Sequence, residues 1–155
     1  MAAAGPVAAM LSVIVTAEAA SDRLPVLLAQ LASAAVDGLV REVLIVGGGP
    51  AKLLEVLREE MGAELAPSLV MAISVARAER LLILPASLRL RSDWLESLGR
   101  HLRCGGAGAL IVGEGGPFSR RGHGVLIGRQ AVAGLAQPDL KRVRRQLART
   151  AVRLA

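Results

Sequence analysis

Three short apolar runs dominate the chain. They cover Leu11–Thr16, Glu42–Val46 and Leu81–Leu84, and they are rich in leucine and β-branched residues. Continuous runs of this length are typical of strands that are covered on both faces in a parallel sheet. Shorter runs at 109–112 and 125–127 predict two further strands.

Between these runs, leucines recur at helical spacing. This spacing predicts helices over Asp22–Ala35, Pro50–Met61 and Ser92–Leu102, the last with Ser92 as its N-cap. The segment Glu64–Ile73 has a weaker strand-like pattern, which Pro67 interrupts. The residues from 74 to 79 then predict a short polar or helical connector.

The alternation of strands and helices predicts a three-layer α/β fold with a mainly parallel sheet. A chain of 155 residues fits one domain, which we expect to span residues 1–155. No internal repeat divides it. The region 105–124 holds eight glycines, which predict a loop rather than a regular element.

Charge is concentrated in the last quarter of the chain. Residues 1–116 hold 10 basic and 12 acidic side chains, whereas residues 117–155 hold 9 basic and 1 acidic. A basic amphipathic helix is predicted over about 138–154, with its charges on Arg142, Arg144, Arg145 and Arg149 among others. Two interpretations stay open: a surface for an anionic membrane or a protein partner, or an ordinary terminal helix with solvated arginines.

Other function classes are disfavoured. The longest uncharged apolar run, residues 6–17, is shorter than the ~20 residues of a membrane span. We therefore expect a cytoplasmic protein, peripheral at the inner membrane face if the basic helix binds lipid. The aromatic residues are limited to Trp94 and Phe118, so no nucleic-acid partner is expected. The single cysteine, Cys104, excludes an intrachain disulfide.

A glycine turn follows the second apolar run. Gly47, Gly48 and Gly49 lie between a predicted strand and a predicted helix, where backbone amides can receive a phosphate. The third glycine of a dinucleotide-binding fingerprint would fall on Lys52, however, and the G-K-[ST] ending of a P-loop is missing. The turn is therefore either a weak phosphate site or a plain tight turn.

A collinear series of segments resembles the GT-A-type family 2 glycosyltransferases. Residues 11–15 (LSVIV) and 23–25 (RLP) look like the opening strand and helix of the family, and residues 42–46 (EVLIV) look like its second strand. Residues 76–84 (ARAERLLIL) are similar to the A-R-G-E-x-L-L-F-L segment, residues 92–96 (SDWLE) to the W-L helix, and residues 124–129 (GVLIGR) to the G-x-L-x-R-R strand.

The resemblance also identifies what this chain lacks. In the family, an aspartate after the second strand contacts the nucleotide base, and a D-A-D motif binds the divalent cation that bridges the diphosphate. The matching positions here hold Gly47, Lys52, Pro85 and Ser87. The family's P-x-x-N-E loop is replaced by residues 16–20. The resemblance thus implies that the metal site is lost, and we expect no cofactor.

The candidate residues follow from this alignment. Those implied to contact a nucleotide are Thr16, Glu18, Gly47, Gly48, Gly49, Lys52 and Ser87. No residue is assigned to catalysis; Asp139 is a weak candidate for the base, against a role at a helix N-terminus.

The predicted function is a glycosyltransferase-like domain that binds a nucleotide sugar weakly or has a non-catalytic interaction role, as a pseudoenzyme would. The alternatives are a metal-independent transferase that uses Lys52 or an arginine in place of the cation, and a scaffold that acts through the basic helix.

Overall fold

The computed structural model describes residues 11–16, 24–36, 40–46, 55, 59, 62–85, 88–103, 108–111, 124–128 and 152–154. Three helices and seven strands have defined bounds in these ranges. The helices are α1 (Leu24–Val36), α3 (Leu69–Val75) and α4 (Trp94–Arg103). The strands are β1 (Leu11–Thr16), β2 (Val40–Val46), β3 (Glu64–Ala66), β4 (Arg80–Pro85), β5 (Ala109–Ile111), β6 (Gly124–Gly128) and β7 (Val152–Leu154).

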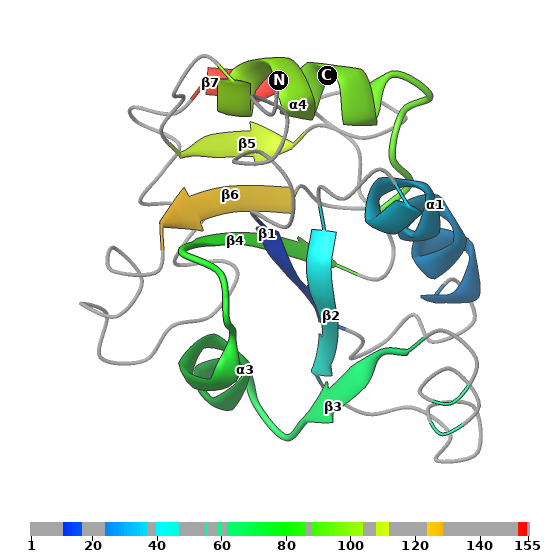
Figure 1. The fold of residues 1–155 in the computed structure, drawn as a ribbon, viewed down its shortest axis with the longest axis vertical. Coiled ribbons are helices and arrows are strands. Elements are labelled where there is room, and N and C mark those ends of the chain that lie inside the picture. The colour runs from blue at the N-terminus through cyan, green and yellow to red at the C-terminus, as the bar shows by residue number, and fades with distance from the viewer. Residues whose placement is uncertain are drawn as a thin grey trace.

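The strands form one sheet in the order β3-β2-β1-β4-β6-β5-β7 (Figure 1). The first four strands of this order are parallel to one another. Strand β6 is antiparallel to both β4 and β5, and β7 is parallel to β5. The prediction of a mainly parallel sheet is confirmed, with β6 as the reversed strand.

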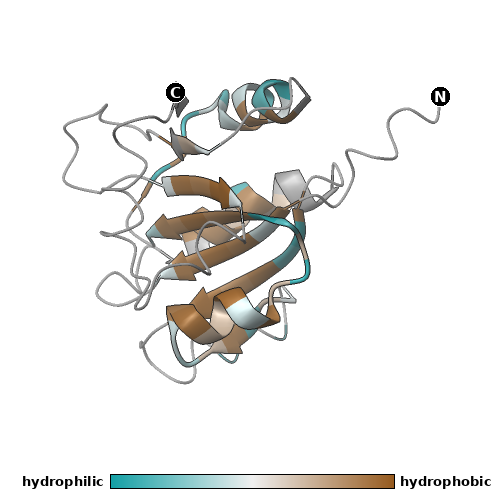
Figure 2. Cartoon of the chain, turned by 90° about the vertical axis from the view of Figure 1, so that its left-hand side faces the viewer, coloured by the Kyte–Doolittle hydropathy of each residue, from teal (hydrophilic) through white to brown (hydrophobic). Residues whose placement is uncertain are grey.

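Each central strand divides its side chains between two cores. In β1, Leu11, Val13 and Val15 face the core that includes residues of α1 and α4, whereas Ile14 faces the core that includes α3. All four of these side chains are fully buried, and each such burial contributes about 1.5–3 kcal/mol to stability. Helices thus cover both faces of a hydrophobic sheet (Figure 2), which confirms the three-layer α/β fold.

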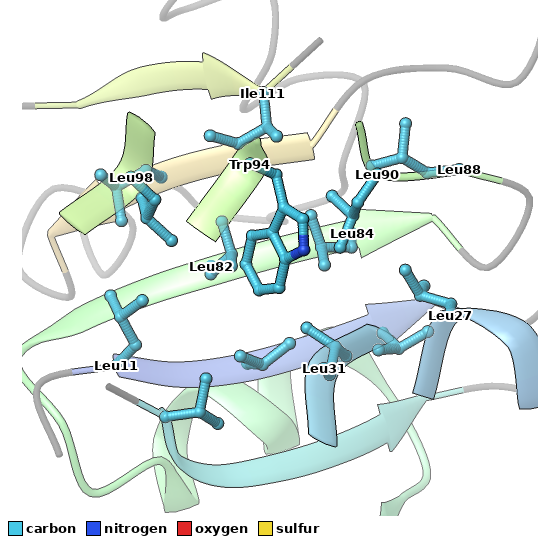
Figure 3. Packing of buried hydrophobic residues seen from close by; sticks show 14 of the residues in the cluster. Leu11, Leu27, Leu31, Leu82, Leu84, Leu88, Leu90, Trp94, Leu98 and Ile111 are labelled. Carbon is cyan, nitrogen blue, oxygen red and sulfur yellow. The ribbon is translucent and has the colours of Figure 1, made fainter. Parts of the chain in front are cut away.

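Trp94 fills the centre of the core between the sheet and α4. Its ring points from the first residue of α4 onto β4, against Leu82 and Leu84 (Figure 3). Leu98 and Leu102 continue the buried stripe of this helix. Helix α4 begins at Trp94 rather than at the predicted Ser92, because the Asp93 carbonyl accepts the first helical hydrogen bond, from the Ser97 N–H at 3.0 Å.

The prediction of a strand-like stretch over Glu64–Ile73 was wrong in its second half. The strand ends at Ala66, and the next element is helix α3 rather than more strand. Ser68 caps this helix, because its hydroxyl accepts a hydrogen bond from the Met71 N–H at 3.2 Å. The buried residues Leu69, Ala72 and Ile73 have helical spacing, and Pro67 ends the strand before them.

The end of the predicted C-terminal helix is also corrected. Residues Val152–Leu154 form strand β7, which pairs in parallel with Ala109–Ile111 of β5. Pairing with β5 satisfies backbone groups that an isolated terminal turn would leave to solvent. The rest of that predicted helix, residues 138–151, lies outside the described residues, as does most of the helix predicted over 50–61. No described helix has the length and apolar character that crossing a bilayer requires.

A buried polar network joins β1, β2 and the connection into β4 at the amino ends of these strands. The Ser12 hydroxyl, which is fully buried, donates to the Glu42 carboxylate at 2.6 Å and accepts from the Ala78 N–H at 3.0 Å. The Arg77 N–H donates to the same carboxylate oxygen at 2.5 Å. At the same end of the strands, on the face that Leu82 and Leu84 share, Nη1 of Arg80 is buried and has no hydrogen-bond partner among the described residues.

Candidate functional site

The carboxyl ends of β1, β2 and β4 meet at one edge of the sheet. Thr16, the last residue of β1, is in register with Val46 on one side and with Pro85 on the other. The chain order reverses at this point, since β2 lies on one side of β1 and β4 on the other. In open α/β sheets, ligands bind in the crevice at such a switch point.

One of the positions that the sequence analysis singled out is described at this edge. Thr16 lies at the end of β1 and is partly buried. In the sequence, Gly47 follows directly on Val46, and Ser87 comes two residues after Pro85. Thr16 is the described residue of this set. The other candidates lie outside the described residues and stay predictions: Glu18, Gly47, Gly48, Gly49, Lys52, Ser87 and Asp139.

The basic residues proposed for partner binding are likewise untested by the structure. Arg142, Arg144, Arg145 and Arg149 lie outside the described residues. The interpretation of this segment as a membrane or protein surface therefore stays a prediction.

The strand ends at this edge do not fit a divalent cation. Thr16, Val46, Ala66 and Pro85 end the four parallel strands, and none carries a carboxylate. Magnesium and manganese prefer carboxylate, carbonyl and water oxygens. Within the described ranges, no group of three or more His, Cys, Asp and Glu side chains is placed to hold a metal ion. The Thr16 hydroxyl offers a hydrogen bond, but the described strand ends supply no anionic ligand.

Strand β6 packs closely against the end of β4. Gly124 begins β6, and a Cβ atom there would lie 2.3 Å from Cδ2 of Leu84 and 3.2 Å from Cβ of Ile111. The absence of a side chain lets β6 approach β4 beside the candidate site. From the sequence, this glycine was identified as part of the glycine-rich region 105–124 and as the first residue of the strand motif at 124–129, but not as a point of close approach.

The segment after β4 is fixed to helix α1. The Leu88 N–H donates to the Pro85 carbonyl at 3.0 Å, which holds Leu88 beside the end of β4. The Gln30 side chain then pairs with Leu90 in both directions: its Nε2 donates to the Leu90 carbonyl at 2.9 Å, and its Oε1 accepts from the Leu90 N–H at 3.2 Å. These bonds connect residues 60 apart in the sequence.

Side chains alternate along this segment. Leu88 and Leu90 are 2% and 1% exposed and belong to the core around Trp94 (Figure 3), whereas Arg89 between them is exposed. Arg91 is also exposed, and its Nε lies 3.9 Å from Oδ1 of Asp93. Arg89 makes no ion pair or hydrogen bond in the part of the chain that the structure describes.

Sequence reasoning missed both Gln30 and Arg89. A glutamine in a helix and an arginine in a loop resemble solvated surface residues, and nothing local links Gln30 to Leu90. The available signal was the alternation Leu88-Arg89-Leu90-Arg91 after the strand predicted at Leu81–Leu84, because alternation indicates an extended segment with one buried side.

Neither sequence comparison identifies a relative. No family model matches the chain, and no curated protein matches it.

Solved structures do match. Glucosyl-3-phosphoglycerate synthase from Mycobacterium tuberculosis, in complex with phosphoglyceric acid, is similar with a TM-score of 0.66 and 16% identity, over 97% of this chain and 70% of that chain. The same enzyme in complex with Mn²⁺, uridine diphosphate and glucosyl-3-phosphoglycerate gives a TM-score of 0.61 and 16% identity, over 86% of this chain and 61% of that chain.

Mannosyl-3-phosphoglycerate synthase from Rubrobacter xylanophilus is similar with a TM-score of 0.51 and 16% identity, over 66% of this chain and 39% of that chain. The chain thus spans only part of the length of each enzyme. At this level of identity, the likeness concerns the fold. The chain has the GT-A-like fold of these glycosyltransferases, as its collinear segments had implied.

Proposed function

We propose that this chain is a glycosyltransferase-like domain that binds a nucleotide sugar weakly at the carboxyl edge of β1, β2 and β4, without metal-dependent transfer. The observation that supports the proposal is the place of Pro85. It ends the central strand β4, in register with Thr16, where the family resemblance puts the first aspartate of the metal motif.

Proline removes the chemistry that this position needs. Its side chain has no atom that can coordinate a cation, and it lacks a backbone N–H that could contact a phosphate. In metal-dependent transfer, the cation neutralises the leaving nucleoside diphosphate, so loss of its ligands raises the barrier to transfer. Contacts to the base, the ribose and the sugar do not require the cation. Weak binding or an interaction role is what such an edge supports.

Calorimetry with uridine and guanosine diphosphate sugars, with and without Mn²⁺, tests the proposal. We expect dissociation constants on the order of 1 mM that do not change with Mn²⁺. Binding at this strength or tighter that depends on Mn²⁺ contradicts the inferred loss of the metal site.

Restoring the two carboxylates is a sharper test. The double variant Pro85→Asp with Ser87→Asp rebuilds the D-A-D pattern at the end of β4. If the alignment is right, Mn²⁺ should strengthen uridine diphosphate binding by about tenfold in this variant. The matched control, Pro85→Ala with Ser87→Ala, should show no such response. An equal response to Mn²⁺ in both double variants places the metal elsewhere and refutes the alignment.

The alternative of metal-independent transfer depends on Lys52. It requires that the chain release nucleoside diphosphate from a nucleotide sugar faster than a Lys52→Ala variant does. Equal rates in the two proteins leave the non-catalytic role.

A further inference from the structure

The loss of carboxylates at the carboxyl edge is accompanied by an exposed arginine at the same edge. Arg89 lies four residues beyond Pro85, and the hydrogen bond from the Leu88 N–H to the Pro85 carbonyl limits how far the chain departs from β4. Turns closed by such a bond bring the first and fourth Cα atoms within about 7 Å. The Arg89 backbone therefore comes directly after Leu88, which this hydrogen bond holds at the end of β4.

The conformation of this segment is fixed on both sides of Arg89. Leu88 and Leu90 are buried in the core, and the Gln30 amide holds both backbone polar groups of Leu90. An extended segment with two buried side chains directs the intervening side chain away from the core. Arg89 is exposed for this reason rather than because the segment lacks contacts.

Among the described residues, the charge of Arg89 also has no partner. The neighbouring Arg91 lies 3.9 Å from a carboxylate oxygen of Asp93, and Arg100 lies 3.0 Å from one of Glu96. Arg89 has no such partner in the ranges that the structure describes. A guanidinium is always charged and offers donors in a planar fork that matches phosphate oxygens.

We propose that Arg89 binds the diphosphate of a nucleotide ligand in place of the divalent cation, and that Gln30 positions it through Leu90. This inference deepens the proposed function and rests on it for the nucleotide, but the contact with diphosphate can be tested alone. It assigns the ligand a chemical class, a diphosphate, and a binding mode that needs no metal.

Calorimetric titration of the full chain with pyrophosphate, uridine diphosphate and uridine, in buffer with a chelator, tests the inference. We expect Arg89→Ala to weaken pyrophosphate and uridine diphosphate binding by about tenfold and to leave uridine binding unchanged. The matched control is Arg77→Ala. Arg77 is an exposed arginine at the opposite edge, and its described hydrogen bond uses the backbone N–H, which the variant keeps.

A double-mutant cycle tests the positioning role of Gln30. Gln30→Ala should weaken pyrophosphate binding by about threefold in the wild-type chain, because Arg89 is then less well held, and should have no further effect in an Arg89→Ala chain. A residue with a merely structural role would lower affinity equally in both backgrounds. Thermal unfolding of each variant identifies any loss of folded protein.

The outcomes separate the two proposals. If uridine diphosphate binds and Arg89→Ala has no effect, the role of Arg89 is refuted and the proposed function stands. If pyrophosphate binds through Arg89 but uridine diphosphate binds no more tightly, the phosphate site stands and the nucleotide function is refuted. If neither ligand binds to the wild-type chain, both proposals are refuted.

Discussion

The two ends of the parallel strands use polar groups differently. At the amino end, Ser12, Glu42 and two backbone N–H groups satisfy one another within the fold. At the carboxyl end, the strands stop at Thr16, Val46, Ala66 and Pro85, and the exposed Arg89 follows without an ion-pair or hydrogen-bond partner among the described residues. Polar atoms that are paired internally stabilise a fold, whereas unpaired ones at a switch point are available to a ligand.

This difference indicates that residues at the amino end determine stability, whereas residues at the carboxyl end determine ligand binding. Substitutions in the amino-end network should change the free energy of unfolding and leave ligand binding intact. Substitutions of Arg89 should do the reverse. The predictions below test this separation, beginning with the largest expected change in stability.

Ser12→Ala should cause the largest loss. The substitution removes only the hydroxyl, which is the donor to Glu42 and the acceptor for the Ala78 N–H. Leaving these groups unsatisfied should lower the free energy of unfolding by about 3 kcal/mol. Urea denaturation measures the change, with Ser74→Ala on the exposed side of α3 as a control of smaller effect. A loss below about 1 kcal/mol would show that water replaces the network.

Gly124→Ala is the matching test at the carboxyl end. The added methyl group meets Cδ2 of Leu84, the flexible end of a side chain, and then Cβ of Ile111 on the adjacent strand. Since Leu84 can rotate but Ile111 cannot easily retreat, we expect a loss of about 2 kcal/mol in the same denaturation experiment. Gly128→Ala is the control, because nothing lies within 4 Å of a Cβ there. Equal losses in both variants would assign the effect to backbone conformation rather than to the close approach of β6.

The strands that could be predicted from the sequence are those with strong local patterns. Leu11–Thr16 was predicted with both bounds correct, and Glu42–Val46 and Leu81–Leu84 lie within β2 and β4. A strand covered on both faces has no polar alternation to mislead the analysis. The order of the strands was not predicted, because pairing is a property of segments far apart in the chain.

The errors have local physical causes. Helix α3 has seven residues, which is less than two full helical periods, so its apolar spacing was difficult to separate from a strand. Strand β7 has three residues, over which the sequence Val-Arg-Leu fits either element. Only the pairing with β5 makes these three residues a strand rather than a helix end.

The candidate site was predictable only in part. The edge formed by Thr16, Val46 and Pro85 follows from the parallel strands that the patterns indicate. The contact between Gln30 and Leu90 could not be predicted, since it joins a helix to a loop across 60 residues through one side-chain amide. The proposed role of Arg89 depends on that contact, which fixes the segment that holds it.

Arg80→Met has the smallest expected effect and the opposite sign. Arg80 begins β4 at the amino end, in register with Leu11 and Gly128, on the face of the sheet that Leu82 and Leu84 share. Its Nη1 is the one buried side-chain nitrogen or oxygen without a partner among the described residues, and a buried unmatched donor costs stability. A methionine of similar length covers the same apolar surface without that donor. We therefore expect the free energy of unfolding to rise by about 1 kcal/mol.

Because Arg80 lies at the amino end, the Arg80→Met variant tests both stability and ligand binding. If its polar groups serve stability alone, removing an unmatched donor there should cost nothing in ligand binding, and urea denaturation should show a stability equal to or above that of the wild-type chain. Arg80→Ala controls for the stem, because it removes both the charge and the packing and should lower stability. A methionine variant that is less stable by 1 kcal/mol or more would mean that the Arg80 guanidinium has a stabilising partner, and the amino end would then be paired more completely than we describe.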